Sequence, residues 1–184
     1  MQAKYQNLIE ITRILTNDCQ KLVSDATSMV NDFKSFCLMN SQWLFEENLD
    51  YFDVSEFDDL SYQDEILLDV FIRRLTSYES DNNFGSSVDC NASLEDILWS
   101  LEGNIEKLDY HLDIGRITSD EEWYGYDALR IIHSHFAEQE YSLVGLDDGS
   151  DTYHLFISPA DRFKEVEALG AALSFDFFQF PDMT

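Results

Sequence analysis

Two apolar runs on either side of a short polar turn constrain the fold more than any other feature of the chain. The runs cover residues 141–146 and 152–157, and residues 147–151 between them read Asp-Asp-Gly-Ser-Asp. Asp and Gly are the residues that tight hairpin turns favour. The pattern therefore predicts an antiparallel β-hairpin in the last third of the chain.

The residues around this hairpin extend the pattern to an α-β-β-α-β unit over 119–184. Ser119, with Glu122 three positions later, has capping-box spacing and predicts a helix that runs to Phe136. Pro159 predicts the start of a second helix, over 160–173. The phenylalanines at 175–178 then predict a final strand.

The preceding two thirds of the chain favour helices. Apolar residues recur three or four positions apart over 5–15 and again over 22–37, so residues 1–39 predict a helical hairpin, with Asn17 or Asp18 capping its second helix. Residues 40–118 form an acidic helical region. In it we expect helices that begin at Ser61 and at Ser93, the second ending at Gly115, and a loop over 80–92.

Together these patterns predict one α+β domain over residues 1–184. The mainly helical N-terminal two thirds would pack against a small antiparallel sheet near the C-terminus. The chain is 45% hydrophobic and 14% aromatic, far richer in aromatic residues than disordered acidic tails, so we expect it to fold. No run approaches the roughly 18 apolar residues of a membrane span, so we expect a cytoplasmic protein that does not bind membranes.

Charge is the strongest indication of function. The net charge is −26, and residues 35–106 hold seventeen acidic residues against two basic ones, Arg73 and Arg74. Such an excess repels itself and works against compactness, but it attracts a basic partner and speeds the encounter with it. It also repels phosphate, so direct nucleic-acid binding is disfavoured.

The segment 43–60 is the candidate partner-binding surface. It mixes large aromatic residues with carboxylates and has no Lys or Arg. Aromatic side chains supply contact area at interfaces, and surrounding carboxylates select a cationic partner. The alternative is a solvated acidic face whose aromatic side chains lie in the core. The candidate anchors and charges are Glu46, Glu47, Asp50, Tyr51, Phe52, Asp53, Phe57, Asp58 and Asp59.

Recognised catalytic and metal-binding motifs are absent from the sequence. It has no GxSxG, P-loop, GxGxxG or HExxH pattern. Its four histidines favour structural roles, and its three widely spaced cysteines favour reduced thiols. The Asp residues of the 147–151 turn do not have EF-hand spacing. We therefore expect no cofactor, no metal and no enzymatic activity.

Two resemblances add to these inferences. Residues 123–129, Trp-Tyr-Gly-Tyr-Asp-Ala-Leu, the predicted hairpin and the helix after it resemble a small bacterial α+β domain of uncharacterised function. The whole chain, small, acidic and free of catalytic motifs, is similar in general character to immunity proteins of bacterial toxin systems. Those proteins bind and neutralise a cognate toxin, often a basic nuclease. Neither resemblance assigns a role to a residue of this chain.

The leading hypothesis is thus an immunity protein that covers the active site or substrate surface of a basic toxin, most economically a nuclease with a cationic phosphate-binding surface. A second hypothesis is a DNA mimic that occupies a DNA-binding protein. A third is a small enzyme or metal-binding module with a site near residues 147–151. The sequence leaves the oligomeric state open.

Overall fold

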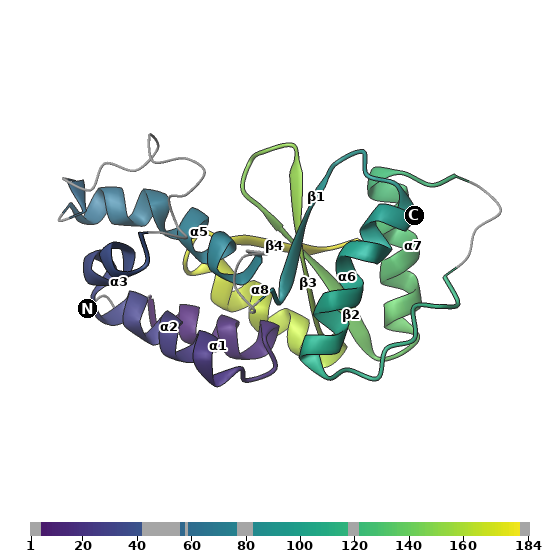
Figure 1. Ribbon diagram of the computed structural model, residues 1–184, viewed down its shortest axis with the longest axis horizontal. Helices are drawn as coiled ribbons and strands as arrows, with labels where there is room; N and C mark the ends of the chain where they lie inside the picture. The colour runs from purple at the N-terminus through teal and green to yellow at the C-terminus, as the bar shows by residue number, and fades with distance from the viewer. Residues whose placement is uncertain (1–4, 42–55, 58, 77–82, 118–121, 181–184) are drawn as a thin grey trace.

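The fold was obtained as a computed structural model (Figure 1). It describes residues 5–41, 56–57, 59–76, 83–117 and 122–180.

The centre of the described structure is a four-stranded antiparallel sheet with the strand order β1-β3-β2-β4. The hairpin predicted from the sequence forms its two inner strands, β2 and β3. The strands are β1 (Gly85–Asp89), β2 (Tyr141–Asp147), β3 (Thr152–Pro159) and β4 (Asp176–Gln179). The predicted hairpin and final strand are therefore confirmed.

Strand β1 corrects the prediction of a loop over residues 80–92. Its sequence, Gly-Ser-Ser-Val-Asp, has one large apolar residue, so local alternation gives little sign of a strand. The strand forms because it pairs along the edge of β3, which places Gly85 opposite Phe156 and Ser87 opposite His154. This pairing joins residues roughly 70 positions apart, and no local pattern reveals it.

Helices cover both faces of the sheet (Figure 1). One face packs against α6 (Leu94–Leu108) and α7 (Gly125–Ala137). The other packs against α1, α5 and α8, and α2 and α3 extend this layer away from the sheet. These helices are α1 (Gln6–Leu15), α2 (Gln20–Asn31), α3 (Phe33–Met39), α5 (Leu60–Thr76) and α8 (Phe163–Ala171), the last preceded by a 3₁₀ turn, η4 (Ala160–Arg162). The α+β class, with helices concentrated in the N-terminal part, is confirmed.

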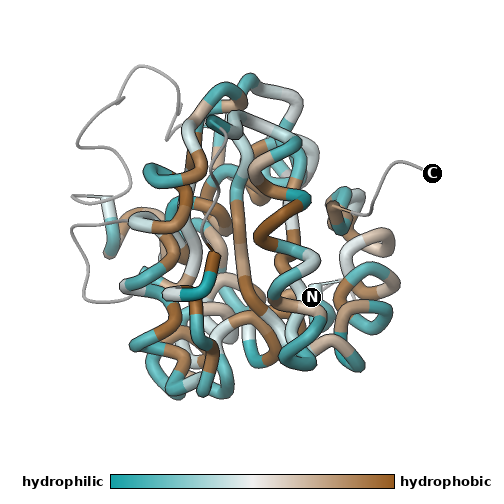
Figure 2. Tube along the Cα trace, turned by 90° about the vertical axis from the view of Figure 1, so that its right-hand side faces the viewer, coloured by the Kyte–Doolittle hydropathy of each residue, from teal (hydrophilic) through white to brown (hydrophobic). Residues whose placement is uncertain are grey.

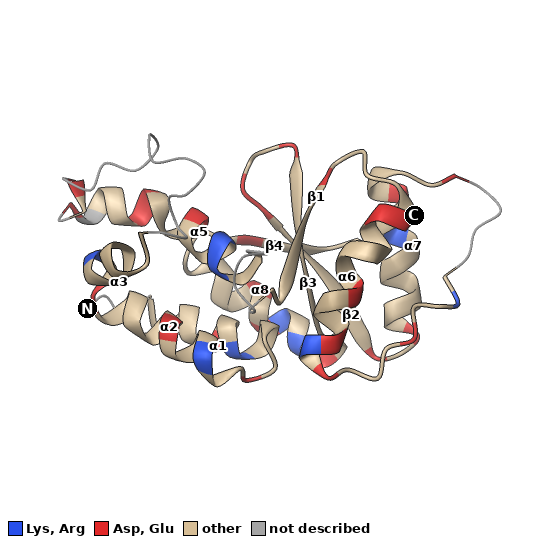
Figure 3. Ribbon diagram, in the orientation of Figure 1, with Lys and Arg blue, Asp and Glu red and all other residues tan. Residues whose placement is uncertain are grey.

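The core lies between the sheet and its two helical layers. Figure 2 shows that hydrophobic residues are concentrated along the inner strands and on the inward sides of the helices. Each of these elements contributes fully buried side chains, among them Val144 and Phe156 from the sheet, Ile11 from α1 and Leu129 from α7. Figure 3 shows acidic residues in both helical layers, with few lysines and arginines among them. No helix among the described residues is long and apolar enough to cross a membrane.

The starts of two helices test the capping predictions. Ser93 caps α6 as predicted, because its Oγ accepts the Asp96 backbone N–H at 3.1 Å and donates to the Asp96 carboxylate at 2.7 Å. The cap predicted at Ser61 is wrong. Helix α5 begins at Leu60, and the Asp59 carboxylate accepts the Ser61 backbone N–H at 2.8 Å. Asp and Ser are both preferred N-cap residues, and Asp59 occupies this position because the helix begins one residue before Ser61.

Three further helix boundaries differ from the predictions. Asn17 and Asp18 both have positive φ and do not cap α2, which begins after Cys19. Helix α6 ends at Leu108 rather than near Gly115, because Asp109 adopts the left-handed conformation. Helix α7 begins only at Gly125, and the predicted cap at Ser119 lies outside the described residues.

Candidate functional site

Trp99, on helix α6, faces solvent. Ile97 and Leu101 are fully buried, whereas Trp99 is 72% exposed. Glu95 lies four residues before Trp99 and Glu102 three residues after it, so both carboxylates share its face of the helix. The outer face of α6 therefore combines a large aromatic surface with two negative charges.

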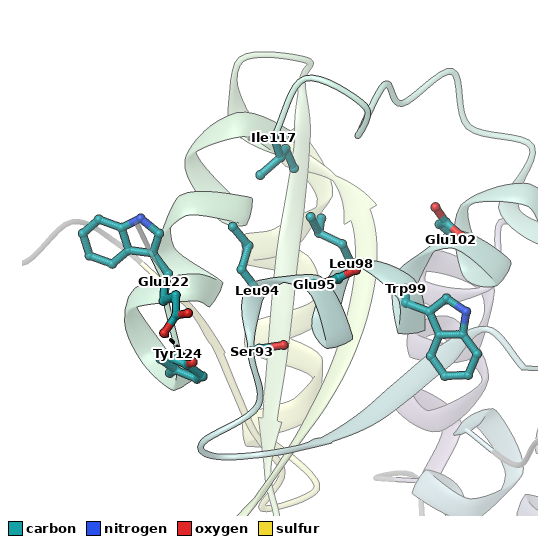
Figure 4. A pocket seen from close by; sticks show the side chains of 10 residues that line it. Ser93, Leu94, Glu95, Leu98, Trp99, Glu102, Ile117, Glu122 and Tyr124 are labelled. Carbon is teal, nitrogen blue, oxygen red and sulfur yellow. Dashed lines mark hydrogen bonds between the residues drawn. The ribbon is translucent and has the colours of Figure 1, made fainter. Parts of the chain in front are cut away.

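This face forms one side of an open cleft of about 700 Å³. Tyr124, immediately before α7, lies on the other side and is 52% exposed. Figure 4 shows Trp99 and Tyr124 far apart across the cleft, with Leu94 and Leu98 between them. The lining residues are Ser93, Leu94, Glu95, Leu98, Trp99, Glu102, Ile117, Glu122, Trp123 and Tyr124.

The backbone connections between α6 and α7 explain why residues of both segments line one cleft. Ser93 forms an isolated antiparallel bridge with Tyr124, and the Leu94 backbone N–H donates to the Trp123 carbonyl at 2.9 Å. These bonds tie the start of α6 to the start of α7. Gly125 adopts φ +53°, and a Cβ there would collide with the Cys90 carbonyl, so the junction requires glycine.

The electrostatics of the cleft favour a cation. Among the described cations, none forms an ion pair with Glu95, Glu102 or Glu122. The Tyr124 hydroxyl donates to the Glu122 carboxylate at 3.1 Å. This hydrogen bond, together with the negative charge of Glu122, raises the pKa of Tyr124, so its phenol stays neutral at physiological pH.

A Lys or Arg side chain entering the cleft would meet both partners that it favours. Carboxylates offer charge-assisted hydrogen bonds, and the face of an indole attracts a cation by roughly 0.5–1 kcal/mol at an exposed site. The leucines between Trp99 and Tyr124 offer apolar contact to the methylene stem of such a side chain. The cleft is thus chemically suited to a basic protein surface.

Most of the partner-binding residues predicted from the sequence cannot be compared with this site. Glu46, Glu47, Asp50, Tyr51, Phe52, Asp53 and Asp58 lie outside the described residues. Phe57 is fully buried, and its ring stacks on that of Tyr62 at 5.9 Å between centroids. It belongs to the core, so its assignment as an exposed anchor is wrong. Asp59 is exposed but serves to cap α5.

The 147–151 turn uses its acidic side chains to hold its own backbone. Asp147 accepts the Gly149 N–H at 2.7 Å, and Asp148 accepts the Ser150 N–H at 2.9 Å. Across the described chain, no three His, Cys, Asp or Glu side chains are grouped so that they could hold a metal ion. The Asp148 carboxylate also lies 2.9 Å from Nε2 of His154.

The Trp99 cleft was not predicted from the sequence, because the apolar stripe of α6 indicates only the buried face of that helix. The available signal was a tryptophan off that stripe, with Glu residues four positions before and three after it. No local signal places Tyr124 in the same cleft, since this depends on the packing of α6 beside α7.

Comparison with known families adds a name for the domain but no activity. A family model described as a domain of unknown function, DUF6630, matches residues 7–181, which include almost every helix and strand described above. The chain belongs to the DUF6630 family. Searches of curated proteins and of solved structures find no match to it. Function must therefore be argued from the site itself.

Proposed function

We propose that this protein is an immunity protein that binds a basic toxin domain and blocks it without chemistry. The observation that supports this most is the cleft between α6 and α7, where exposed aromatic side chains stand among carboxylates that no described cation neutralises. The general acidity of the chain supplies long-range attraction, and the cleft supplies a place for the contact.

The proposed inhibition is steric and electrostatic. A nuclease binds its substrate through a cationic surface, since phosphate contacts dominate nucleic-acid affinity. That surface would be attracted to this protein at a net charge of −26. Once bound, a folded domain of 184 residues would exclude the nucleic acid from it.

A DNA mimic is the second candidate, and the same helix argues against it. Glu95, Glu102 and Glu106 lie on the solvent side of α6, separated along its axis by roughly 10 and 6 Å at about 1.5 Å per residue. A row of this kind could imitate phosphates. The exposed Trp99 stands within the row, however, and favours an aromatic-anchored protein contact instead.

The proposal is tested in cells by co-expression with a basic toxic protein encoded beside this gene. We expect the wild-type chain to restore growth, and the paired substitutions Trp99→Ala and Glu102→Gln to reduce protection. Met39→Ala with Glu138→Gln is the matched control. Met39 is 76% exposed on α3, and Glu138 follows the far end of α7, roughly 20 Å along that helix from Tyr124.

Stability must be separated from binding in this test. Trp99 is 72% exposed, so only about a quarter of its surface is buried. At about 25 cal/mol per Å² and about 250 Å² for the side chain, its removal should cost less than about 2 kcal/mol of folding free energy. Equal protection by both variant pairs, or no protection by the wild-type chain, would contradict the proposal.

A further inference from the structure

Three polar side chains form a continuous hydrogen-bonded chain on the sheet face opposite α6 and α7. The Ser87 Oγ lies 2.8 Å from Nδ1 of His154, and Nε2 of the same ring lies 2.9 Å from the Asp148 carboxylate. His154 is buried, Asp148 is half-buried and Ser87 is exposed. This arrangement has the order hydroxyl, imidazole, carboxylate that activates a serine for nucleophilic attack.

Strand pairing holds the serine and the histidine together. Ser87 and His154 are directly opposite in the β1–β3 ladder. Along an antiparallel ladder, residue pairs that share backbone hydrogen bonds alternate with pairs that do not. The Cys90 N–H donates to the Asp151 carbonyl, so Cys90 and Asp151 form a hydrogen-bonded pair. Ser87 and His154, three positions along, therefore form a pair without mutual backbone hydrogen bonds, in which the facing side chains are closest. The same alternation turns the Ser87 N–H away from β3, toward the edge of the sheet.

The carboxylate fixes the tautomer of the imidazole. Burial raises the pKa of Asp148, but hydrogen bonds from Ser150 and His154 outweigh this effect and leave the pKa lowered. Asp148 is therefore ionised at neutral pH and accepts the Nε2–H of His154. Nδ1 is then the acceptor for the Ser87 hydroxyl. On α5, the Asp69 carboxylate interacts electrostatically with Asp148 and His154, and Arg73 interacts with Asp69.

We propose that Ser87 is the nucleophile of an acyl-transfer site that accepts carboxylic esters. The Ser87 Oγ attacks the ester carbonyl carbon, and its proton passes to Nδ1 of His154. The tetrahedral intermediate expels the alcohol, which takes this proton, and leaves Ser87 acylated. Water then attacks the acyl carbon by the reverse proton path and releases a carboxylic acid.

One feature of the structure supports the proton transfer, and another supports the attack on the carbonyl. The negative charge of Asp148 stabilises the imidazolium that forms when His154 takes the proton. The outward N–H of Ser87 is a donor of the kind that stabilises an oxyanion on the attacked carbonyl. The inference is independent of the proposed binding function, because the cleft lies against the opposite face of the sheet.

The test uses a fluorophosphonate probe on the intact wild-type protein, with the adduct located by peptide mass spectrometry. We expect one dominant adduct on Ser87, absent in Ser87→Ala and retained in the control Ser134→Ala, which removes an exposed serine of α7. His154→Gln should slow labelling by about 100-fold or more, the usual contribution of a general base. Asp148→Asn, in the 147–151 turn, gives a second variant that should also slow labelling.

A purely structural hydrogen-bonded chain predicts a different result. In that case Ser87 would react no faster than other exposed serines, and the variants would change the melting temperature without changing labelling. Either the absence of a Ser87 adduct in the wild-type protein or an unchanged labelling rate in folded Asp148→Asn would overturn the proposal. Trp99→Ala should label like the wild-type protein, which separates this test from that of the binding function.

Discussion

Replacing Gly145 with alanine tests the packing of the sheet directly. Gly145 lies opposite Phe178 in the β2–β4 ladder. A Cβ at position 145 would stand 2.5 Å from Cζ of the Phe178 ring and within 3.0 Å of two more ring atoms. Real Cβ atoms do not approach aromatic carbons this closely, so the ring must move.

The expected cost follows from what the Phe178 ring touches. It makes edge contacts with Phe180 at 5.0 Å and with Tyr153 at 6.4 Å between centroids. Such pairs contribute about 0.5–1.5 kcal/mol each, and overpacking usually costs about 1–3 kcal/mol. We therefore expect Gly145→Ala to lower the free energy of unfolding by about 2 kcal/mol, or the melting temperature by roughly 4–8 °C.

A double-mutant cycle in urea, followed by far-UV circular dichroism, measures this cost and its cause. Phe178→Leu alone should destabilise the protein by removing ring contacts. In its presence Gly145→Ala should cost much less than 2 kcal/mol, because the colliding atoms are gone. Additive losses, or a neutral Gly145→Ala, would refute the reasoning.

Three further predictions concern other parts of the fold. Burial raises the pKa of the Cys37 thiol to about 12, so in the native protein a thiol-specific reagent should modify the two partly exposed cysteines and reach Cys37 only after unfolding. Hydrogen bonds from Ser35 and Ser61 lower the pKa values of the helix-capping Asp32 and Asp59. Because these folded-state pKa values lie below 3.8, the stabilisation from the two ionised caps is present above pH 3.8 and is lost as the pH falls through the folded-state values. In an acid titration, Asp32→Ala and Asp59→Ala should therefore lose less free energy of unfolding than the wild-type protein. Asp25→Asn removes the carboxylate that pairs with the buried guanidinium of Arg74 and should cost roughly 2–3 kcal/mol in chemical denaturation, less than for a fully buried pair because Asp25 is 28% exposed.

The parts of the fold that were predicted correctly depend on local signals. The hairpin has its turn residues beside its strands, and the Ser93 cap has its partner Asp96 three positions away. Strand β1 and buried Phe57 were predicted wrongly because their environments come from distant segments. An aromatic residue among carboxylates has the same local pattern whether its ring lies in the core or in solvent.

The candidate sites show the same limit more strongly. The acidity of the chain favours a cationic partner as a hypothesis, but it gives no position for the contact. Trp99 and Tyr124 line the same cleft only because α6 packs beside α7. Ser87, His154 and Asp148 meet only because β1 joins the edge of the hairpin. Strand register and helix packing are properties of the folded chain, and spacing along the sequence does not contain them.

We propose the cleft between α6 and α7 as the contact for a basic protein partner. This is tested by the dissociation constant of the purified complex with the basic toxin encoded beside this gene, compared between Trp99→Ala/Glu102→Gln and Met39→Ala/Glu138→Gln. We predict a loss of about 30-fold or more for the cleft pair, which corresponds to the roughly 2 kcal/mol typical of an interface anchor, and less than about threefold for the control pair. Equal weakening by both pairs would show that only the overall charge attracts the partner, and would contradict the claim.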